Sequence, residues 1–326
     1  MKTPYLLEAK NICFSFQNRK ILDNFNLAIK KGEIHCLLGE KDSGKSTFVK
    51  IIGGVYPYQS YSGEIFFNGN PVKFSSQKDS EAAGIGVVYQ NFKLIPQFSV
   101  CENIFLASEF EFMGVINWRK AFERAQSLFK ELGFNIFPGN IVSELNNWEK
   151  QIVKVARALV KNPLLVVFDD VTSELSENEG ESFLQIIRQL KLKKGLTVLF
   201  ISHRTNEVFD IADRVSVLRG GKIVISEDMQ NADEDIIVRK MTGRDFVTIE
   251  SDDNFWRSFG ITEREKEIIS LLLKGFNNRE ISDKLFISLN TVKTHIYSIY
   301  QKTNVNNRLE LANLIKEKKT NKNNEI

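Results

Sequence analysis

Short apolar runs alternate with longer amphipathic stretches through most of the chain. Nine of these runs span six to eight residues, are rich in β-branched and aromatic side chains, and are bounded by turn residues, which is typical of strands. They occupy residues 11–16, 22–29, 33–39, 63–69, 85–90, 164–170, 196–202, 214–221 and 222–227. Between them, apolar residues recur at helical spacing over 46–54, 117–132 and 149–161. Strands that alternate with helices predict an α/β domain built on a largely parallel sheet.

The pattern changes near residue 250, where the polar and acidic stretch "IESDDN" predicts a linker over residues 248–257. Only helical patterns follow it, over residues 262–274, 278–285, 289–302 and 307–317. We therefore predict an α/β domain over 1–247, a small all-α four-helix domain over 258–318, and a polar tail over 319–326.

The charge of the chain is divided unevenly between these parts. The net charge is +3, but the residues from Ser258 onward carry 12 Lys or Arg against 8 Asp or Glu. The 257 residues before them have a net charge of −1. A basic C-terminal part indicates a nucleic-acid partner, although a solvated charged face fits the charge alone equally well.

The sequence also bears on the cellular compartment. The first residues lack the charged-then-apolar pattern of a secretory signal, and no apolar run approaches the roughly 18 residues that span a bilayer. The three cysteines show no metal-ligand or redox spacing, which fits free thiols in a reducing compartment. We expect a soluble cytoplasmic protein.

A phosphate-binding loop is the clearest chemical motif. The segment "GEKDSGKST" at residues 39–47 matches G-x-x-x-x-G-K-[ST] and directly follows the predicted strand 33–39. In such a loop, backbone N–H groups point at phosphate oxygens, while Lys45 adds a cation and Ser46 offers a hydroxyl to Mg²⁺. A carboxylate for the metal should end a later apolar strand, and "LLVVFDD" at 164–170 supplies Asp169 with Asp170 beside it.

The loop is part of a longer pattern that resembles the ABC-type ATPases, most closely their sugar-importer branch. The resemblance is carried by "KGEIHCLLGEKDSGKSTFVKIIGGVYPYQSYSGEIFFNG", "VVYQNFKLIPQFSVCENIFL", "VARALVKNPLLVVFDDVTSEL" and "LFISHRTNEVFDIADRVSVLRGGKIV". It extends from about Leu6 to Asp245. It implies a P-loop NTPase fold with a RecA-like core, a helical subdomain and an antiparallel β part.

The resemblance also implies roles for single residues, with ATP and Mg²⁺ as cofactors. Phe16 would stack on adenine, Gln90 would sense Mg²⁺ and the γ-phosphate, and His203 would contact the γ-phosphate. Outside this context, His203 would simply be a hydrogen-bonded loop residue. The ATP-binding loop would comprise Gly39, Glu40, Lys41, Asp42, Ser43, Gly44, Lys45, Ser46 and Thr47, and the Mg²⁺ ligands or sensors would be Ser46, Gln90 and Asp169.

Two positions of the nucleotide motifs depart from the family. Asp42 stands where the family's loop has a glycine, which places a carboxylate near a polyanion and should weaken binding unless it points away. Aspartate tolerates the left-handed backbone better than most residues, so the loop can keep its shape. Asp170 stands where the family has its catalytic glutamate. It is one methylene shorter, and a misplacement of about 1 Å costs on the order of a hundredfold in rate.

A third departure lies in the family's signature, L-S-G-G-Q or L-S-V-G-Q. This chain reads L-N-N-W-E, with residues Leu145, Asn146, Asn147, Trp148 and Glu149. In the family, the signature of one cassette caps the ATP held by a second cassette. The ring of Trp148 should hinder that arrangement, unless it packs on the subdomain surface. In either case the usual cap is absent, so we expect weak ATP hydrolysis at most, while nucleotide binding can persist.

The C-terminal helices carry their own pattern. Thr262 and Glu265 form a capping-box pair at the start of the first helix, and Ser288 is placed to cap the third. On that third helix Val292, Ile296 and Ile299 repeat at i, i+4 and i+7, which predicts an inward apolar stripe. Two short helices with a tight turn, the second of which exposes basic and polar groups, predict a helix-turn-helix.

This segment resembles the LuxR-type DNA-binding domain through "ITEREKEII", "NNREISDKLFIS", "TVKTHIYSIYQK" and "NRLELA". The resemblance implies that Lys293, Thr294 and Tyr297 lie over base edges in the major groove. It makes Thr291, His295 and Lys302 candidates for phosphate contacts or for helix support. His295 fits a packed helix residue equally well.

Two functions from different classes fit these patterns. The first is a transcription regulator, in which a degenerate cassette binds ATP and serves as sensor and dimerisation switch for a DNA reader. It implies a homodimer on an inverted repeat in double-stranded DNA. The alternative is an ATP-hydrolysing subunit of a sugar importer that meets membrane transport subunits and carries an accessory DNA-binding domain. A third possibility is a cassette that no longer binds nucleotide and only mediates protein contacts.

Overall fold

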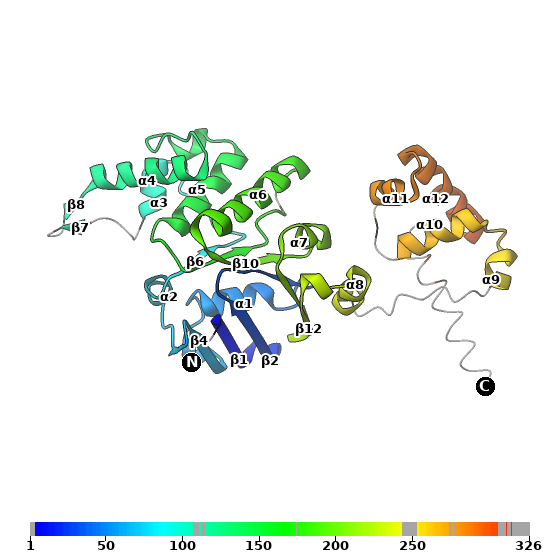
Figure 1. Ribbon diagram of the computed structural model, residues 1–326, viewed down its shortest axis with the longest axis horizontal. Coiled ribbons are helices and arrows are strands. Elements are labelled where there is room, and N and C mark those ends of the chain that lie inside the picture. Colours follow the sequence, from blue (N-terminus) through cyan, green and yellow to red (C-terminus); the bar gives the residue numbers. More distant parts are fainter. Residues whose placement is uncertain are drawn as a thin grey trace. The chain divides into compact units, whose positions relative to one another are not determined.

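The computed structural model describes residues 4–106, 111–112, 115–173, 175–242, 253–273, 276, 278–305, 311 and 314. The chain divides into two compact units, residues 1–242 and 243–326 (Figure 1). The first unit contains the predicted alternation of strands and helices, and the second unit is helical in its described part.

A six-stranded sheet forms the centre of the first unit, with strand order β12-β11-β3-β10-β9-β6. All neighbouring pairs are parallel except β11 and β12, which form an antiparallel hairpin. This confirms the largely parallel sheet that the sequence predicts. The strands are β3 (Ile34–Leu38), β6 (Ile85–Val88), β9 (Leu165–Asp169), β10 (Thr197–Ser202), β11 (Arg214–Arg219) and β12 (Lys222–Asp228).

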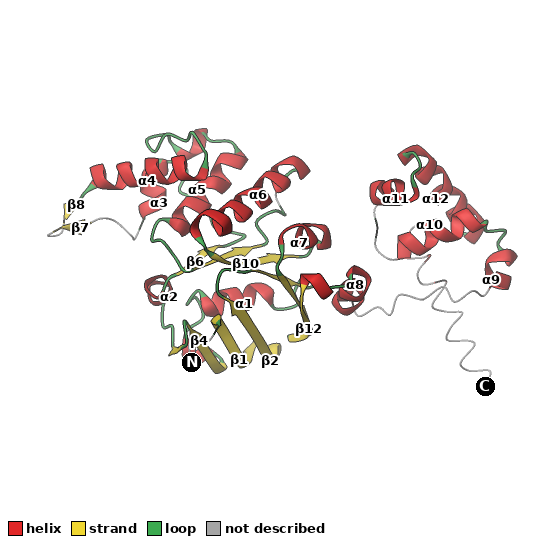
Figure 2. Cartoon of the chain, in the orientation of Figure 1, coloured by secondary structure: helices red, strands yellow, loops and turns green. Residues whose placement is uncertain are grey.

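A second, antiparallel sheet has the strand order β2-β1-β4-β5 (Figure 2). Its strands are β1 (Tyr5–Phe16), β2 (Arg19–Lys30), β4 (Ser62–Phe67) and β5 (Asn70–Val72). The pair β1–β2 ends in a tight turn at residues 17–18, which places Phe16 opposite Arg19. The short strands β7 (Glu111–Phe112) and β8 (Val115–Ile116) pair with each other.

Helices complete the first unit. They are α1 (Lys45–Ile52), α2 (Gln77–Ala83), α3 (Val100–Phe105), α4 (Trp118–Leu132), α5 (Asn147–Leu159), α6 (Glu177–Lys194), α7 (Thr205–Ile211) and α8 (Glu234–Thr242). The 3₁₀ turns are Tyr58–Ser60, Val142–Glu144 and Met229–Asn231. None of the helices in the described part of the chain has the length and apolar character needed to cross a bilayer.

The central sheet separates two hydrophobic cores, because successive side chains of a strand point to opposite faces. On β9, Val166 and Phe168 join the core shared with α3–α6, whereas Leu165 and Val167 join the core shared with α1 and the antiparallel sheet. Burial on both faces explains why these strands appear in the sequence as unbroken apolar runs.

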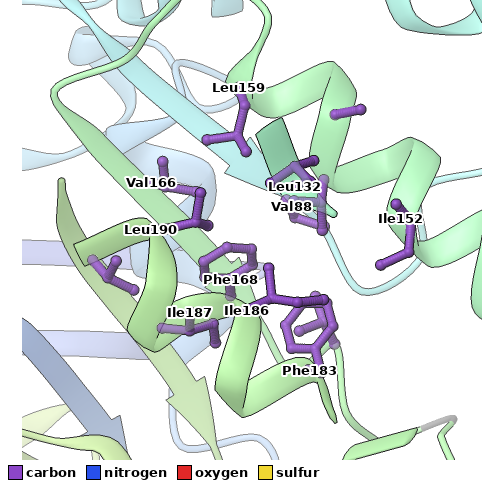
Figure 3. Packing of buried hydrophobic residues seen from close by; sticks show 14 of the residues in the cluster. Val88, Leu132, Ile152, Leu159, Val166, Phe168, Phe183, Ile186, Ile187 and Leu190 are labelled. Carbon is purple, nitrogen blue, oxygen red and sulfur yellow. The ribbon is translucent and has the colours of Figure 1, made fainter. Parts of the chain in front are cut away.

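Phe183 of α6 is a focus of the first of these cores. Its ring meets that of Phe168 edge to face, with centroids 5.5 Å apart (Figure 3). Side chains of α5 and α6, among them Ile152, Leu159 and Ile187, surround the same region. The helical layer is therefore packed directly on the strand whose end carries the two aspartates of the nucleotide motif.

The second unit has its own hydrophobic core. Its helices are α9 (Asp253–Ser258), α10 (Glu263–Leu273), α11 (Asn278–Leu285) and α12 (Leu289–Thr303). The stripe of Val292, Ile296 and Ile299 is buried, as its spacing predicts. Of the helix expected over 307–317, the structure describes only Leu311 and Leu314, and both are helical. The tail over 319–326 lies wholly outside the described residues.

The linker predicted over residues 248–257 is wrong in its second half. Helix α9 begins at Asp253, and Trp256 is 3% exposed in the core of the second unit. The polar stretch "IESDDN" predicted a linker, but the apolar pair Phe255 and Trp256 that follows it packs against Phe259 and the other helices. The remaining part of the predicted linker, up to residue 252, lies outside the described residues.

Candidate functional site

The phosphate loop joins the end of β3 to the start of α1. Gly44, directly before α1, has φ +111°, a conformation that glycine adopts at little cost. Asp42 has φ +63°, so it accepts the left-handed geometry that the family's glycine would supply. Gly39 leaves no room for a side chain, because a Cβ there would lie 2.5 Å from the Leu218 carbonyl oxygen. The loop therefore keeps a defined shape despite Asp42.

Lys45 lies inside the loop and is 8% exposed. Its Nζ donates to the carbonyl oxygens of Gly39 at 2.7 Å and Glu40 at 2.8 Å. Burial lowers the pKa of the Lys45 ammonium, and the nearby carboxylates of Asp170 and Asp169 oppose that shift. The cation is thus held by loop carbonyls at the centre of the site.

Ser46 and Asp169 meet at the junction of α1 and β9, as expected for a magnesium-binding pair. The Ser46 hydroxyl donates to Asp169 Oδ1 at 3.1 Å, and Asp169 is 3% exposed. Burial raises the pKa of the Asp169 carboxyl, and the hydrogen bond from Ser46 partly opposes this rise. The resulting pKa of Asp169 is about 6. Two oxygen donors that share one desolvated position fit a hard divalent cation such as Mg²⁺.

Both carboxylate oxygens of Asp170 are engaged. His203 Nδ1 lies 3.0 Å from Oδ1, and Gln90 Nε2 donates to Oδ2 at 3.2 Å. Asp170 itself has φ +50°, and its backbone N–H donates to the Ile201 carbonyl oxygen at 3.1 Å. The residue in the position of the family's catalytic base therefore joins the loops that carry Gln90 and His203.

These residues surround one cleft of about 950 Å³. Of the residues that the sequence singled out, it is lined by Glu40, Lys41, Asp42, Gly44, Lys45, Ser46, Thr47, Gln90, Asp169, Asp170 and His203. The lining, over the described part of the chain, does not include Phe16, Gly39 or Ser43. Phe16 is 53% exposed and pairs with Arg19, which does line the cleft, so it stands at the rim.

The sequence motifs did not indicate five further lining residues. They are Arg19, Ile21, Lys50, Ser173 and Met241. Lys50 follows Ser46 by four residues on α1, so helical spacing could have found it. Arg19 and Ile21 follow Phe16 on the next strand and have no motif of their own. Met241 is remote in sequence from the phosphate loop, and no local pattern points to it.

The residues of the altered signature form a helix cap. Asn146 is the N-cap of α5, and its side chain accepts the Glu149 backbone N–H at 2.8 Å. The Glu149 carboxylate in turn accepts the Asn146 backbone N–H at 3.0 Å. This is a reciprocal capping box, which satisfies two of the helix's free N–H groups and sets a negative charge at the positive end of its dipole. Leu145 is buried, while Asn147 is exposed.

Trp148 is half-buried and packs within its own unit. Its ring meets Phe134 at 6.0 Å and Phe183 at 6.4 Å between centroids, both edge to face. The structure thus has the packing that the sequence offered as the alternative, while the hindrance of a second cassette by this ring stays a prediction. Two aromatic partners from α6 and the segment after α4 draw the ring inward.

The helix-turn-helix unit presents the expected polar face on α12. Lys293, Thr294 and Tyr297 are exposed, and Tyr297 is 68% exposed. Ser288 caps the helix through the Thr291 N–H at 3.1 Å, and the Thr291 hydroxyl bonds the Ser288 hydroxyl at 2.8 Å. His295 is intermediate in burial. Lys293, Thr294 and Tyr297 are therefore placed to reach a ligand, whereas Thr291 takes part in the cap.

Lys302 supports the fold of this unit. Its Nζ pairs with both oxygens of Glu265 at 2.9 and 2.7 Å. Glu265 is 2% exposed, and it also caps α10 through the Thr262 N–H at 2.8 Å and accepts the Ser298 hydroxyl at 2.7 Å. Of the two roles that the sequence left open for Lys302, the structure therefore favours helix support.

A phosphate-loop sequence, a buried carboxylate that pairs with Ser46, and a glutamine and a histidine around one cleft define a P-loop nucleotide-binding domain. The family model "ABC transporter" matches residues 22–173, and the model "Bacterial regulatory proteins, luxR family" matches residues 260–315. The chain therefore combines an ABC-type cassette with a LuxR-type DNA-binding domain. ABC cassettes bind ATP with Mg²⁺.

Curated relatives match about three quarters of the chain. The xylose import ATP-binding protein XylG of Thermoanaerobacter pseudethanolicus is 43% identical over 243 residues, which cover 74% of this chain and 48% of the relative. The L-arabinose transport ATP-binding protein AraG of Geobacillus stearothermophilus is 40% identical over 245 residues, again 74% of this chain and 48% of the relative. The chain thus spans about half the length of the curated relatives it matches.

Solved structures support the cassette fold. The chain is similar to cbiO1 of Clostridium perfringens, part of the transporter complex cbiONQ, with 22% identity, a TM-score of 0.62, and coverage of 74% of this chain and 96% of that chain. It is also similar to the cassette MJ0796, described as dimeric, with 27% identity, a TM-score of 0.60, and coverage of 69% and 100%. The predicted P-loop NTPase fold is confirmed.

Proposed function

We propose that this protein is a cytoplasmic DNA-binding transcription regulator whose cassette binds ATP with Mg²⁺ and hydrolyses it weakly or not at all. The cassette acts as the sensor and dimerisation switch, and the LuxR-type unit reads an inverted repeat in double-stranded DNA. The observation that carries the proposal is a division within the cassette. Lys45 in the phosphate loop and the pair Ser46–Asp169 are arranged to bind Mg-ATP. In the signature segment, by contrast, the side chains of Asn146 and Glu149 cap the N-terminus of α5.

Nucleotide binding is supported by the fit between the cleft and Mg-ATP. Lys45 is a buried cation within the loop, and Ser46 with Asp169 offers two oxygens for the metal. Phe16 lies at the rim, outside the residues that line the cleft, and its side chain is exposed enough to stack on a base. Bound Mg²⁺ would neutralise phosphate charge, and Lys45 and the loop N–H groups would orient the phosphates.

Weak hydrolysis is supported by two features. Asp170 is shorter than the family's glutamate, and its oxygens already hold His203 and Gln90. The N-terminus of α5 carries the Glu149 carboxylate, which would repel a phosphate presented by a second cassette. A cassette with these features can bind ATP without completing the usual catalytic arrangement.

Dimerisation is supported by the likeness to MJ0796, whose structure is described as dimeric. Helix-turn-helix proteins bind two half-sites as dimers, with one reader per half-site. A cassette whose association depends on nucleotide would set the spacing of two DNA-binding units and thereby their joint affinity.

One observation favours the alternative of an importer subunit. Relatives at 40% and 43% identity are sugar import or transport ATP-binding proteins, and the similarity covers 74% of this chain. In that case the cassette would dock on membrane transport subunits and hydrolyse ATP. The altered signature and Asp170 weigh against this alternative.

Nucleotide binding and turnover, measured side by side on the full-length protein, separate the candidates. We expect ATP with Mg²⁺ to bind with a Kd below 1 mM in isothermal titration, and Lys45→Ala to weaken it at least about tenfold. Turnover should stay far below the roughly 1–10³ s⁻¹ typical of enzymes. Fast ATP turnover would overturn the proposal that the protein is a regulator. Absence of binding by ATP and ADP at millimolar concentration would leave a cassette that only mediates protein contacts.

A further inference from the structure

The last helix of the first unit, α8, contributes a residue to the wall of the nucleotide cleft. Met241 lines the cleft together with Arg19 and Ile21, although the phosphate loop lies about 200 residues earlier in the sequence. Met241 is the second-to-last residue of α8, and unit 1 ends at Thr242. A residue at the exit of the cassette therefore takes part in the nucleotide site.

Helix α8 is held firmly at its centre and at its end. Ile237 is fully buried in the core shared with the helical layer, and Met241 packs against that same core. Arg219, at the end of β11, donates from Nη1 to the Lys240 carbonyl oxygen at 3.3 Å. The last turn of α8 is thus fastened to the end of β11 at Lys240, and the next residue, Met241, lines the cleft.

The end of β11 also touches both sides of the nucleotide site. The Leu218 carbonyl lies so close to Gly39 that a Cβ there would approach it to 2.5 Å. The Gly221 carbonyl, in the turn after β11, accepts the Asp23 N–H of β2 at 3.0 Å. The phosphate loop, the β2 wall and the end of α8 therefore all meet at β11.

The residue type at position 241 suits the organic end of a nucleotide. Lys45, Ser46 and Asp169 supply the charges for phosphates and metal, whereas Ile21 and Met241 add apolar surface on the wall that continues towards Phe16. A methionine thioether is polarisable and adaptable, and it packs well against the edges and faces of aromatic rings.

We propose that Met241 contacts the base or ribose of the bound nucleotide and makes the end of α8 the element through which nucleotide occupancy alters DNA binding. Directly after Thr242 the chain enters the unit that carries the LuxR-type domain. A nucleotide that fixes Met241 fixes the last turn of α8, from which the DNA-binding unit continues. This proposal rests on nucleotide binding by the cassette, as proposed above.

Such a coupling is reciprocal, since nucleotide must change DNA affinity by the same factor as DNA changes nucleotide affinity. The test therefore measures the Kd of Mg-ATP with and without DNA, on the full-length protein. The DNA is a labelled duplex recovered by selection with that protein. For the native chain we expect the two values to differ at least about fivefold, which is within the usual range of allosteric coupling.

Two substitutions distinguish a coupling contact from general packing. Met241→Ala should weaken Mg-ATP alone by about fivefold and bring the coupling factor close to one, while DNA affinity without nucleotide stays unchanged. Met241→Leu, which retains the volume, should preserve most of the coupling. Met229→Ala is the matched control, because Met229 is also half-buried against the same core but does not line the cleft. It should leave the coupling intact.

The outcomes separate this inference from the proposed function. If the native chain binds no Mg-ATP, the proposed nucleotide binding itself fails. If it binds Mg-ATP and DNA with a coupling factor of one, the switch through α8 is wrong while nucleotide binding stands. If Met241→Ala keeps the native coupling factor, or if Met229→Ala removes it equally, Met241 is not the residue that carries the coupling.

Discussion

Replacing Glu265 by glutamine should destabilise the DNA-binding unit by an amount that follows from its surroundings. The carboxylate is 2% exposed and accepts hydrogen bonds from Thr262, Ser298 and Lys302. Burial alone would raise the pKa of Glu265. The hydrogen bonds from Lys302, Thr262 and Ser298 outweigh it and hold that pKa to about 2.

The expected free energy follows from linkage between protonation and folding. The ordinary pKa is 4.5, so the difference is about 2.5 units, which at about 1.36 kcal/mol per unit amounts to about 3–3.5 kcal/mol. Because the pKa in the folded state is the lower one, the charged carboxylate stabilises the fold at all pH values above about 4.5. This stabilisation is lost as the pH falls from about 4.5 to about 2.

Urea unfolding read through Trp256 isolates the relevant unit. The chain has three tryptophans, and replacing Trp118 and Trp148 by phenylalanine leaves Trp256, which is buried in the core of the second unit. In this background, Glu265→Gln should lower the unfolding free energy by about 3 kcal/mol at pH 7. Ser298→Ala removes only one hydrogen bond and should cost about 1 kcal/mol, which provides a milder variant if the first does not fold.

The pH profile decides whether the reasoning holds. The parent protein should lose about 3 kcal/mol between pH 5 and pH 2, and Glu265→Gln should lose clearly less over the same interval. Parallel profiles for the two proteins, or equal stability at pH 7, would refute the assignment of this stabilisation to the Glu265 charge.

Three further outcomes are expected. Trp148→Gly should lower the unfolding free energy of the cassette by about 2–4 kcal/mol, because the ring loses its contacts with Phe134 and Phe183; unchanged urea unfolding would contradict this packing role. Lys293→Ala should relax sequence preference at one base pair by about 1–3 kcal/mol in a competition assay, whereas Lys302→Ala should mainly reduce stability; equal effects on both readouts would be contrary to their separate roles. Asp170→Ala should bind Mg-ATP about three- to tenfold more tightly in calorimetry, because a carboxylate that lines the cleft, and would repel the phosphates, is removed; weaker binding would show that Asp170 helps to hold the nucleotide.

The sequence predicted the architecture of the cassette because its central strands are buried on both faces. Stretches such as residues 165–168 and 198–201 are apolar throughout, and a short unbroken apolar run between turn residues is typical of a strand that lies between two cores. Strand β5 escaped prediction, since its three residues, Asn70–Val72, include a proline and no alternation. Because Trp256 follows shortly after an acidic and polar stretch, the sequence predicted a linker where the structure has α9.

The contiguous parts of the candidate site were predictable for a similar reason. A phosphate loop depends on local backbone geometry, so residues 39–47 identify it without reference to the rest of the chain. Met241 and Ile21 reach the cleft only through the packing of α8 and β2, which no local pattern encodes. The role of Trp148 likewise depended on Phe134 and Phe183, which lie 14 residues before it and 35 residues after it in the sequence.

The capping box at the start of α5 makes a return to the family's signature costly one step at a time. Glutamine in place of Glu149 would remove the charge that complements the helix N-terminus, and glycine in place of Trp148 would leave a void beside Phe183. Serine in place of Asn146 could still cap the helix, but on its own it would restore no glycine for a close approach of phosphate. Each intermediate would thus be less stable than its predecessor or no better at hydrolysis. If the cassette hydrolyses ATP weakly, as proposed, single substitutions towards the family's signature would therefore cost stability before they could restore hydrolysis.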